Sequence, residues 1–343
     1  MIILLVSVVM SFLTTFFITP YFIRFLYIAG IVGLDLQKKD KPKLPTSGGI
    51  CVAFGVLAGL LTYIGLYTFV PSFFPSVSTL KISVIPLLAV TSSVLIVMFV
   101  GLLDDLNVRS RKVRTKEGYD IRIGFTQWIK PLLTLPAAIP LMAISAGVDT
   151  MAIPFIGNVE LGVLYPLLLI PIGVVGASNV VNMLAGFNGL ESGMGIVYLL
   201  GLGIFALLNG SIGSIIFLVA FAALVGFIKY NWYSAKILPG DSLTYLLGSI
   251  VAAGVIVGNM ERTGIIVMLP FIIEFFLKLR VRFKATCLGK LRIDGKLDPP
   301  YGRKVYSWTH FIMNLRPMTE KQVTILLIAI QFCFVILIFL PLF

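Results

Sequence analysis

The sequence has few charged residues, and this scarcity excludes a soluble protein. Only 12% of its 343 residues are Asp, Glu, Lys or Arg, whereas 58% are hydrophobic and the mean hydropathy is +1.03. About one residue in four is charged in a soluble domain. The composition therefore predicts a membrane protein without any soluble module long enough to fold alone. Since no soluble basic module exists, nucleic acid is a poor candidate partner.

Histidine and cysteine are scarce, which excludes a zinc site and a disulfide framework. The chain has one histidine, His310, and three cysteines, Cys51, Cys287 and Cys333. The cysteine spacing matches no metal-binding pattern, and one histidine does not make a metal site. We expect the three cysteines to be structural and unpaired, and His310 to take no part in the chemistry.

Long apolar runs are what the sequence has in abundance. A helix needs about 20 apolar residues to cross a bilayer. Runs close to that length recur throughout, with no internal repeat. We predict an all-α polytopic membrane protein with about ten transmembrane helices in one domain, 1–343. The predicted spans are 1–28, 47–70, 83–103, 125–146, 161–178, 193–209, 212–229, 242–258, 264–280 and 322–342.

Basic residues lie on one side of this arrangement. No Lys or Arg precedes the first run, which favours an N-terminus outside the cell and argues against a cleaved signal peptide. Ten spans then place both termini outside. Of the 27 Lys and Arg residues, 25 fall in the cytoplasmic segments or the helix ends beside them. The net charge of +12 thus sets the topology and attracts anionic lipids or a polyanionic substrate. The predicted cytoplasmic segments are 29–46, 104–124, 179–192, 230–241 and 281–321.

The segment 179–193 is polar and glycine-rich although it lies between two apolar runs. Polar backbone beside a bilayer is costly unless it lines a site. Asparagine oxygens suit Mg²⁺ and the edges of nucleobases, and glycine lets the backbone approach a ligand. The segment therefore indicates a binding site, and the alternative is a short polar loop. Its candidate residues are Asn179, Asn182, Gly186, Asn188 and Glu191.

Three aspartates reach the same predicted interface from other loops. Asp104 and Asp105 close the third span, and Asp241 opens the eighth. Separately, the pair could be solvated loop acids facing the basic run 109–114, and Asp241 could be a helix N-cap. Together with the asparagines they supply hard oxygens from three loops, as Mg²⁺ requires at phosphoryl-transfer sites.

Two further features lie on this face. Lys130, near the start of the fourth span, is either a cation at the depth of a lipid phosphate or a snorkelling side chain. In the last loop, an Asp-Gly turn predicts a hairpin over 290–297. A helical pattern after it predicts a helix in the membrane interface. The pattern consists of Val305, Trp308, Phe311, Ile312 and Leu315.

Glu274 lies inside the ninth predicted span, where a carboxylate is functional by default. Lys278 follows four residues later, and an i,i+4 ion pair explains the acid adequately. We therefore leave Glu274 out of the site.

The order and spacing of these motifs resemble the polyprenyl-phosphate N-acetylhexosamine-1-phosphate transferase superfamily, over most of the chain. The central Ala185-Gly186-Phe187-Asn188-Gly189 and the later Asn231-Trp232-Tyr233 are similar to the eukaryotic and archaeal dolichyl-phosphate branch. The bacterial branches usually have Asp-Gly-x-Asp-Gly in the central motif. The matching motifs are Lys43 to Gly49, Asp104-Asp105, Lys130, Asn179-x-x-Asn182-x-x-x-Gly186-x-Asn188-Gly189-Leu190 and Gly240-Asp241.

The resemblance implies transfer of GlcNAc-1-phosphate from UDP-GlcNAc to a polyprenyl, dolichyl-type phosphate, with release of UMP. This is the first membrane step of lipid-linked glycan synthesis for N-glycosylation. It implies Mg²⁺, or Mn²⁺ in its place, at Asn182 and Asp241. The predicted topology places the active site on the cytoplasmic side. The compact length favours a prokaryotic, archaeal membrane.

The remaining roles follow from the same resemblance. Gly186 and Asn188 match uridine-binding positions, and Asn179 and Glu191 are further candidates for the UDP-sugar. Lys130 matches a residue near the lipid phosphate. Asp104 or Asp105 would take or orient the last proton of that phosphate. In the last loop the usual His/Arg cluster has no clean counterpart, and Lys290 and Arg292 are the candidates for the pyrophosphate.

The sequence leaves alternatives open. Within the superfamily, the chain could transfer another UDP-sugar, including MurNAc-pentapeptide, to undecaprenyl phosphate. Outside it, a lipid or solute transporter would place polar residues near the midplane, whereas here they gather at one interface. A homodimer is also left open.

Overall fold

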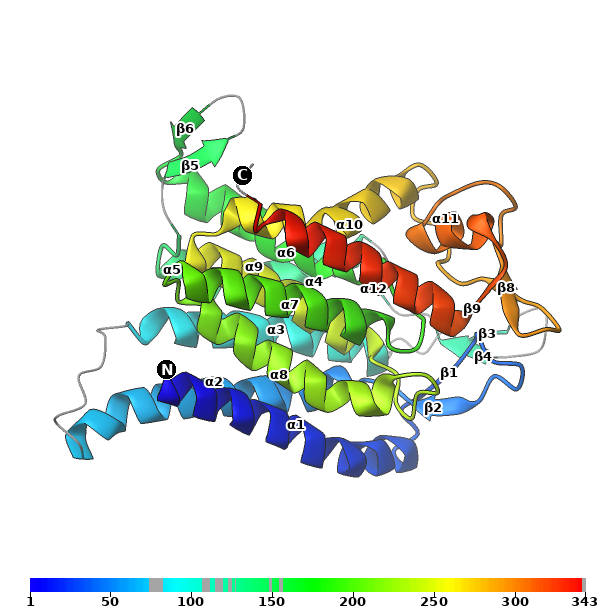
Figure 1. The fold of residues 1–343 in the computed structure, drawn as a ribbon, viewed down its shortest axis with the longest axis horizontal. Helices are drawn as coiled ribbons and strands as arrows, with labels where there is room; N and C mark the ends of the chain where they lie inside the picture. Colours follow the sequence, from blue (N-terminus) through cyan, green and yellow to red (C-terminus); the bar gives the residue numbers. More distant parts are fainter. Residues whose placement is uncertain are drawn as a thin grey trace.

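The computed structural model describes residues 1–73, 83–106, 112–114, 120–122, 125–126, 128–147, 150–153 and 157–340. Within these residues the chain is predominantly helical, and its long helices run roughly side by side (Figure 1). The α-helices are α1 Ile2–Ile28, α2 Gly49–Phe73, α3 Ile85–Leu106, α4 Ile129–Thr134, α5 Ile139–Ala143, α6 Ile170–Val181, α7 Leu190–Leu208, α8 Gly213–Asn231, α9 Gly240–Gly258, α10 Glu261–Leu279, α11 Trp308–Leu315 and α12 Glu320–Leu337. A 3₁₀ segment, Leu135–Ala138, joins α4 to α5, and a π-helical turn, Tyr165–Leu169, leads into α6.

Seven of the described helices are long and apolar enough to cross a membrane, which supports the predicted polytopic architecture. They are α1, α2, α3, α7, α8, α9 and α12. Shorter apolar helical stretches, Ile129–Ala143 and Tyr165–Val181, coincide with the fourth and fifth predicted spans. Helix α10 coincides with the ninth but carries Glu274 and Lys278. The number of crossings stays a prediction.

Short strands form four small antiparallel sheets in the described residues, whereas the sequence predicted only the hairpin in the last loop. That hairpin is present and is extended to three strands by β9. Strands this short bury too few side chains to produce a readable alternation, so composition alone does not reveal them. The strands are β1 Val32–Leu34, β2 Lys43–Pro45, β3 Lys112–Arg114, β4 Asp120–Arg122, β5 Thr150–Ile153, β6 Gly157–Glu160, β7 Lys290–Leu291, β8 Lys296–Asp298 and β9 Met318–Thr319.

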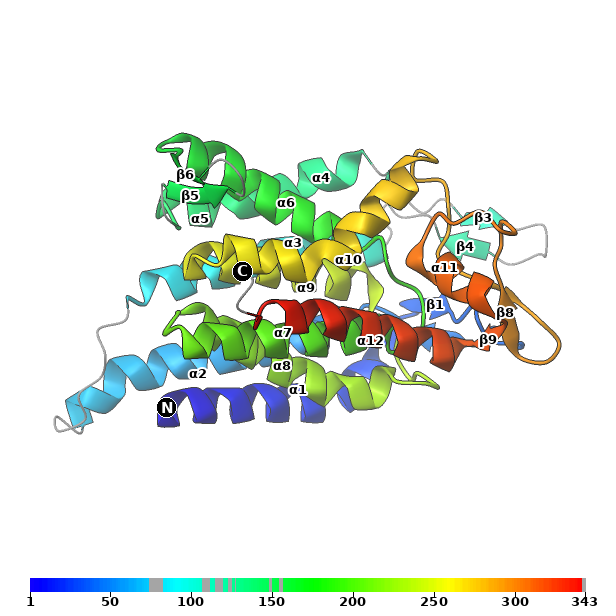
Figure 2. The ribbon, with the colours of Figure 1, turned by 45° about the horizontal axis from the view of Figure 1, so that its top comes forward.

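The two ends of the helical bundle differ. Strands β1, β2, β8 and β9 and helix α11 gather at one end (Figures 1 and 2). Helix α1 begins and α12 finishes toward the opposite end, where β5 and β6 also lie. The three loops that the sequence predicted to share one face, around Asp105, Asn182 and Asp241, do meet, because all three residues border one cavity.

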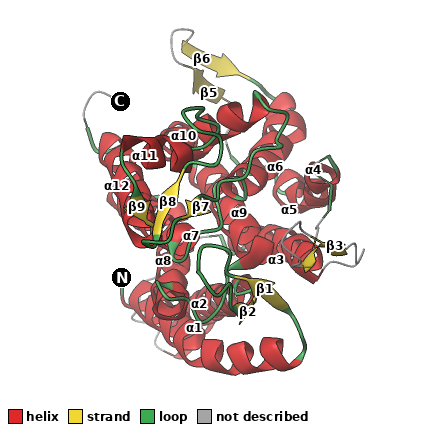
Figure 3. Cartoon of the chain, turned by 90° about the vertical axis from the view of Figure 1, so that its right-hand side faces the viewer, coloured by secondary structure: helices red, strands yellow, loops and turns green. Residues whose placement is uncertain are grey.

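Helix α9 lies in the middle of the bundle, as the end-on view in Figure 3 shows, and packs along both α3 and α6. Two glycines permit this close approach. A Cβ at Gly101 of α3 would lie 2.6 Å from the carbonyl oxygen of Asp241, and one at Gly248 of α9 would lie 2.3 Å from that of Ala177. Small residues let helix backbones come together in membranes. The packing brings the ends of α3 and α6 to the start of α9.

Candidate active site

A polar cavity of about 430 Å³ lies beside the β1–β2 hairpin. It is formed where the end of α3, the end of α6 and the start of α9 meet, on the side predicted to face the cytoplasm. The end of β2 and the residues before α2 are tied to the segment before α9, because Leu238 N–H donates to Pro45 O (2.8 Å) and Gly48 N–H to Leu238 O (3.0 Å). Most of the predicted site residues line this cavity. They are Asp105, Lys130, Asn182, Gly186, Asn188, Glu191 and Asp241.

Asp105 caps the N-terminus of α9. Its Oδ1 accepts the N–H of Asp241 at 2.7 Å, and its Oδ2 accepts the N–H of Ser242 at 3.1 Å. Gly240 makes room for this contact: its φ is +72°, and a Cβ there would lie 2.4 Å from Asp105 Oδ2. The alternative in which Asp241 caps its own helix is therefore wrong. The cap comes from α3, and the Asp241 carboxylate is left for other contacts.

Asp104 has a different role from its neighbour. Its Oδ2 lies 2.6 Å from Lys130 Nζ, and its Oδ1 accepts the N–H of Phe125 at 2.5 Å. The same Nζ is 2.9 Å from Asp241 Oδ2. Lys130 is buried between the two carboxylates, so it is not a snorkelling side chain with a solvated ammonium. Asp104 is also buried and is not a solvated loop acid.

Asn182 lies next to this triad. It follows the last residue of α6, and its Oδ1 accepts the Thr244 hydroxyl at 2.9 Å. Among the described residues, no three His, Cys, Asp or Glu side chains form an all-protein metal cage. The oxygens available as metal ligands are those of the partly exposed Asp241 carboxylate and of the Asn182 amide. This set fits Mg²⁺, which commonly uses one or two protein oxygens together with phosphate and water.

Asn188 and Glu191 border another part of the cavity. The side-chain amide of Asn188 donates from Nδ2 to Asp35 Oδ2 at 3.0 Å, and its backbone N–H donates to Glu320 Oε1 at 2.7 Å. Glu191 Oε1 accepts the N–H of Gly186 at 2.7 Å. Its Oε2 is buried without a partner among the described residues. A buried unpaired carboxylate oxygen beside a cavity is costly, which supports a ligand-binding role for this region.

Sequence reasoning missed three residues of this region: Asp35, Lys38 and Glu320. Lys38 Nζ lies 3.6 Å from Asp35 Oδ2 and contacts Glu320 Oε2. Asp35 is one of only two acids in a basic loop, and Glu320 opens the last helix, so both carried a weak signal. Their partners are 153 and 132 positions away from them, at Asn188.

Asp104 and three other predicted residues, Asn179, Lys290 and Arg292, are not part of the cavity lining. The Asn179 amide donates to Val175 O (2.8 Å) and to Thr134 Oγ1 (3.3 Å) within the helices. Lys290 lies in β7, and Arg292, next to that strand, pairs with Asp294 and Asp298. Their predicted contacts with the UDP-sugar stay predictions.

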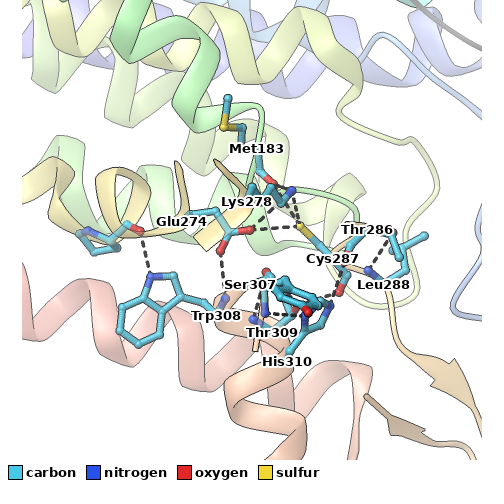
Figure 4. Close-up of polar contacts among 12 residues, drawn as sticks. Met183, Glu274, Lys278, Thr286, Cys287, Leu288, Ser307, Trp308, Thr309 and His310 are labelled. Carbon is cyan, nitrogen blue, oxygen red and sulfur yellow. Dashed lines mark hydrogen bonds and ion pairs between the residues drawn. The ribbon is translucent and has the colours of Figure 1, made fainter. Parts of the chain in front are cut away.

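A buried polar cluster attaches the last loop, between α10 and α11, to α10 and to the loop between α6 and α7 (Figure 4). Lys278 lies 3.5 Å from Glu274, which is the predicted i,i+4 ion pair, and 3.0 Å from Cys287 Sγ. Both Lys278 Nζ and Cys287 Sγ donate to the carbonyl oxygen of Met183, the residue after Asn182. Burial raises the pKa of the Cys287 thiol. All three cysteines are free, as predicted.

The same cluster includes the start of α11 (Figure 4). The backbone N–H of Trp308 donates to Glu274 Oε2 at 2.9 Å. The buried ring of His310 accepts the N–H of Tyr306 at Nδ1 (3.2 Å), so its Nε2 donates to Thr286 O (2.8 Å). Burial lowers the pKa of His310 from 6.5 to about 4. His310 is therefore a neutral ring that fixes the loop.

Comparison with known proteins places the chain in a family. A model described as glycosyl transferase family 4 matches residues 87–259, from near the start of α3 to the residue after α9. The chain belongs to this family. Two archaeal relatives, from Saccharolobus solfataricus and Sulfolobus acidocaldarius, are 34% and 31% identical over 97% of this chain, covering 95% and 94% of their own length. Both are named as UDP-N-acetylglucosamine–dolichyl-phosphate N-acetylglucosaminephosphotransferases.

A eukaryotic relative with the same name, from Dictyostelium discoideum, is 27% identical over 88% of this chain and 79% of its own. The resemblance to the sugar-1-phosphate transferase superfamily, and to its archaeal and eukaryotic branch, is thus confirmed.

Proposed function

We propose that this family 4 member transfers GlcNAc-1-phosphate from UDP-GlcNAc to a dolichyl-type polyprenyl phosphate, releasing UMP and forming the diphosphate-linked lipid. The observation that carries the proposal is the single cavity in which Lys130, Asp241 and Asn182 lie together with Asn188. One part of it suits phosphates and a cation, and another suits a nucleobase. The names of the archaeal and eukaryotic relatives support the choice of UDP-GlcNAc and dolichyl phosphate.

The chemistry needs charge and alignment more than a protein nucleophile, because the acceptor is already a phosphate anion. Mg²⁺ bound by Asn182 and Asp241 would offset the charge of the sugar diphosphate. The ammonium of Lys130 attracts the phosphate of the lipid. Asp104 holds that ammonium, and Asp105 holds the backbone that carries Asp241. The lipid phosphate oxygen attacks the β-phosphorus, the bond to UMP breaks, and UMP leaves with the electron pair.

An apolar cavity of about 340 Å³ between α6, α9 and α10 suits the prenyl chain of the acceptor. Val180 of α6 lines it, two residues before Asn182 of the polar cavity. A chain lying there would bring its phosphate toward Lys130. Gly176 also lines this cavity, and a Cβ on it would meet no atom within 4 Å, which leaves space for a ligand at that point.

The proposal includes the orientation of the protein in its membrane. Ten crossings with both termini outside would put the polar cavity on the cytoplasmic side, where soluble UDP-sugars are available. The basic loops support this, as do the start of α1 and the end of α12, which lie toward the end of the bundle opposite β1 and β2 (Figure 1). The archaeal relatives support an archaeal cell membrane.

Purified protein with dolichyl or undecaprenyl phosphate and a panel of radiolabelled UDP-sugars tests the proposal. We expect transfer from UDP-GlcNAc that requires Mg²⁺ or Mn²⁺ and stops in EDTA. Preferred transfer from a different UDP-sugar would reject the substrate assignment, and full activity in EDTA would reject the metal.

A further inference from the structure

The hydrogen bonds of Asn188 fix the orientation of its side-chain amide. Nδ2 donates to a carboxylate oxygen of Asp35, and a carboxylate only accepts hydrogen bonds. The amide nitrogen must therefore face Asp35. Among the described residues, no donor reaches Asn188 Oδ1, and this oxygen is not one of the buried atoms without a partner. Since Asp35 and Asn188 both border the polar cavity, the amide presents an acceptor there.

We propose that Asp35 is a positioning residue that holds Asn188 with its oxygen toward the cavity, so that the site selects uracil over cytosine. The proposal rests on the proposed UDP-sugar function. Uracil carries a hydrogen on N3, whereas N3 of cytosine is an acceptor. An oxygen fixed by Asp35 accepts the uracil N3–H and faces the cytosine lone pair without a proton between them.

The surrounding residues keep Asp35 and Asn188 in place. Asp35 is 5% exposed and Asn188 4%. Lys38 lies 3.6 Å from the Asp35 oxygen that accepts the amide. Glu320 accepts the backbone N–H of Asn188, so the main chain is held independently of the side chain. Turning the amide over would place Oδ1 against the Asp35 carboxylate, two acceptors in contact, and would leave Nδ2 without this partner.

Binding of UMP and of CMP to the purified protein, measured by calorimetry, tests the proposal without the lipid. The wild type should bind UMP at least about thirtyfold more tightly than CMP, as expected when a polar site faces a mismatched group. In Asp35→Asn either orientation of the Asn188 amide is satisfied, since residue 35 then both donates and accepts. Lys38 stays with Glu320, its closer partner. The UMP-to-CMP ratio should fall by about tenfold or more.

Two further variants separate positioning from structure. Glu320→Gln changes the charge of the same cluster but still accepts the backbone N–H, so its ratio should stay at the wild-type value. The double variant Asp35→Asn/Asn188→Asp exchanges the two groups: the new amide donates to the new carboxylate, whose second oxygen faces the cavity. This variant keeps the total charge and should restore preference for UMP.

The outcomes are distinct. A wild type that prefers UMP while Asp35→Asn keeps the full ratio overturns the positioning role and leaves the proposed function intact. Equal weakening of both nucleotides in Asp35→Asn would mean a purely structural role. If Asp35→Asn does not fold, a double variant that prefers CMP or neither nucleotide overturns the proposal. A wild type that binds neither nucleotide rejects the UDP-sugar function itself.

Discussion

Lys130, which lines the polar cavity, and Lys38, which pairs with the lining residue Asp35, each lie between two carboxylates. The two clusters differ in how exposed those carboxylates are. Lys130 lies 2.6 Å from Asp104 and 2.9 Å from Asp241, and the Asp241 side chain is 32% exposed. Lys38 lies between Asp35 and Glu320, whose side chains are only 5% and 4% exposed. The exposed Asp241 carboxylate is the group that we propose binds a ligand. In the Lys38 cluster both carboxylates accept hydrogen bonds from Asn188.

Removing the Asp241 carboxylate should have the largest effect on activity. Asp241→Asn keeps the volume and the Asp105 cap but removes the charge proposed to bind Mg²⁺. Because a metal contributes several kcal/mol to transition-state stabilisation, we expect kcat to fall about 1,000-fold or more, measured by radiolabelled lipid product. The exposed Asp40, changed to Asn, is the matched control and should stay within about twofold of wild type. Near wild-type activity of Asp241→Asn would contradict the metal assignment.

Changes at Asn188, which the Lys38 cluster holds, should weaken nucleotide binding and affect lipid binding little. Asn188→Ala removes the amide that Asp35 orients. A lost hydrogen bond of about 1–3 kcal/mol corresponds to a rise of roughly five- to a hundredfold in the KM for UDP-GlcNAc. Steady-state kinetics with each substrate varied in turn measure this. An unchanged nucleotide KM with a raised lipid KM would reverse the positions of the two substrates.

The apolar cavity that we propose holds the prenyl chain can be altered without changing either lysine cluster. Gly176→Leu would place a side chain in open space between α6 and α10, so we expect the lipid KM to rise about tenfold with the nucleotide KM unchanged. Gly65→Leu, also built into space without neighbours within 4 Å, is the control on α2. A nucleotide KM that rises together with the lipid KM would show that the two cavities are not separate subsites.

The smallest expected effect concerns the last loop and pH. The pKa of His310 is about 4 when folded and 6.5 when exposed, so the unfolded loop binds the proton more tightly. Stability is complete above pH 6.5 and falls as the pH drops toward 4, by about 2 kcal/mol. Thermal unfolding followed by the fluorescence of Trp308 and the other tryptophans should show this loss in the wild type. His310→Gln, which can still donate to Thr286, should lack this part of the loss; an identical pH profile would exclude His310 as its source.

Helices could be read from the sequence because the length and apolarity of each run determine whether it crosses the bilayer. All ten predicted spans overlap helices of the structure. The short strands could not be read, since two to four residues show no periodicity. Their pairing depends on partners brought together by the fold.

The candidate site was predictable where its residues carry unusual chemistry for their position, as Asp241 and Asn182 do. The different contacts of Asp104, with Lys130, and of Asp105, with the start of α9, were not predictable. It depends on which way each side chain leaves the end of α3, and on an α9 terminus 136 positions away. Asp35 was missed for the same reason: its effect is on an amide in another loop.

The nucleotide released in the reaction tests the central claim most directly. Sugar-1-phosphate transfer must release UMP, whereas attack at the anomeric carbon of the sugar releases UDP and gives a monophosphate-linked lipid. Chromatography of the nucleotide after a single round with UDP-GlcNAc and lipid phosphate distinguishes them. We predict one UMP per lipid product, and regeneration of UDP-GlcNAc when excess UMP is added to that product. Stoichiometric UDP without UMP would contradict the mechanism, even if GlcNAc reached the lipid.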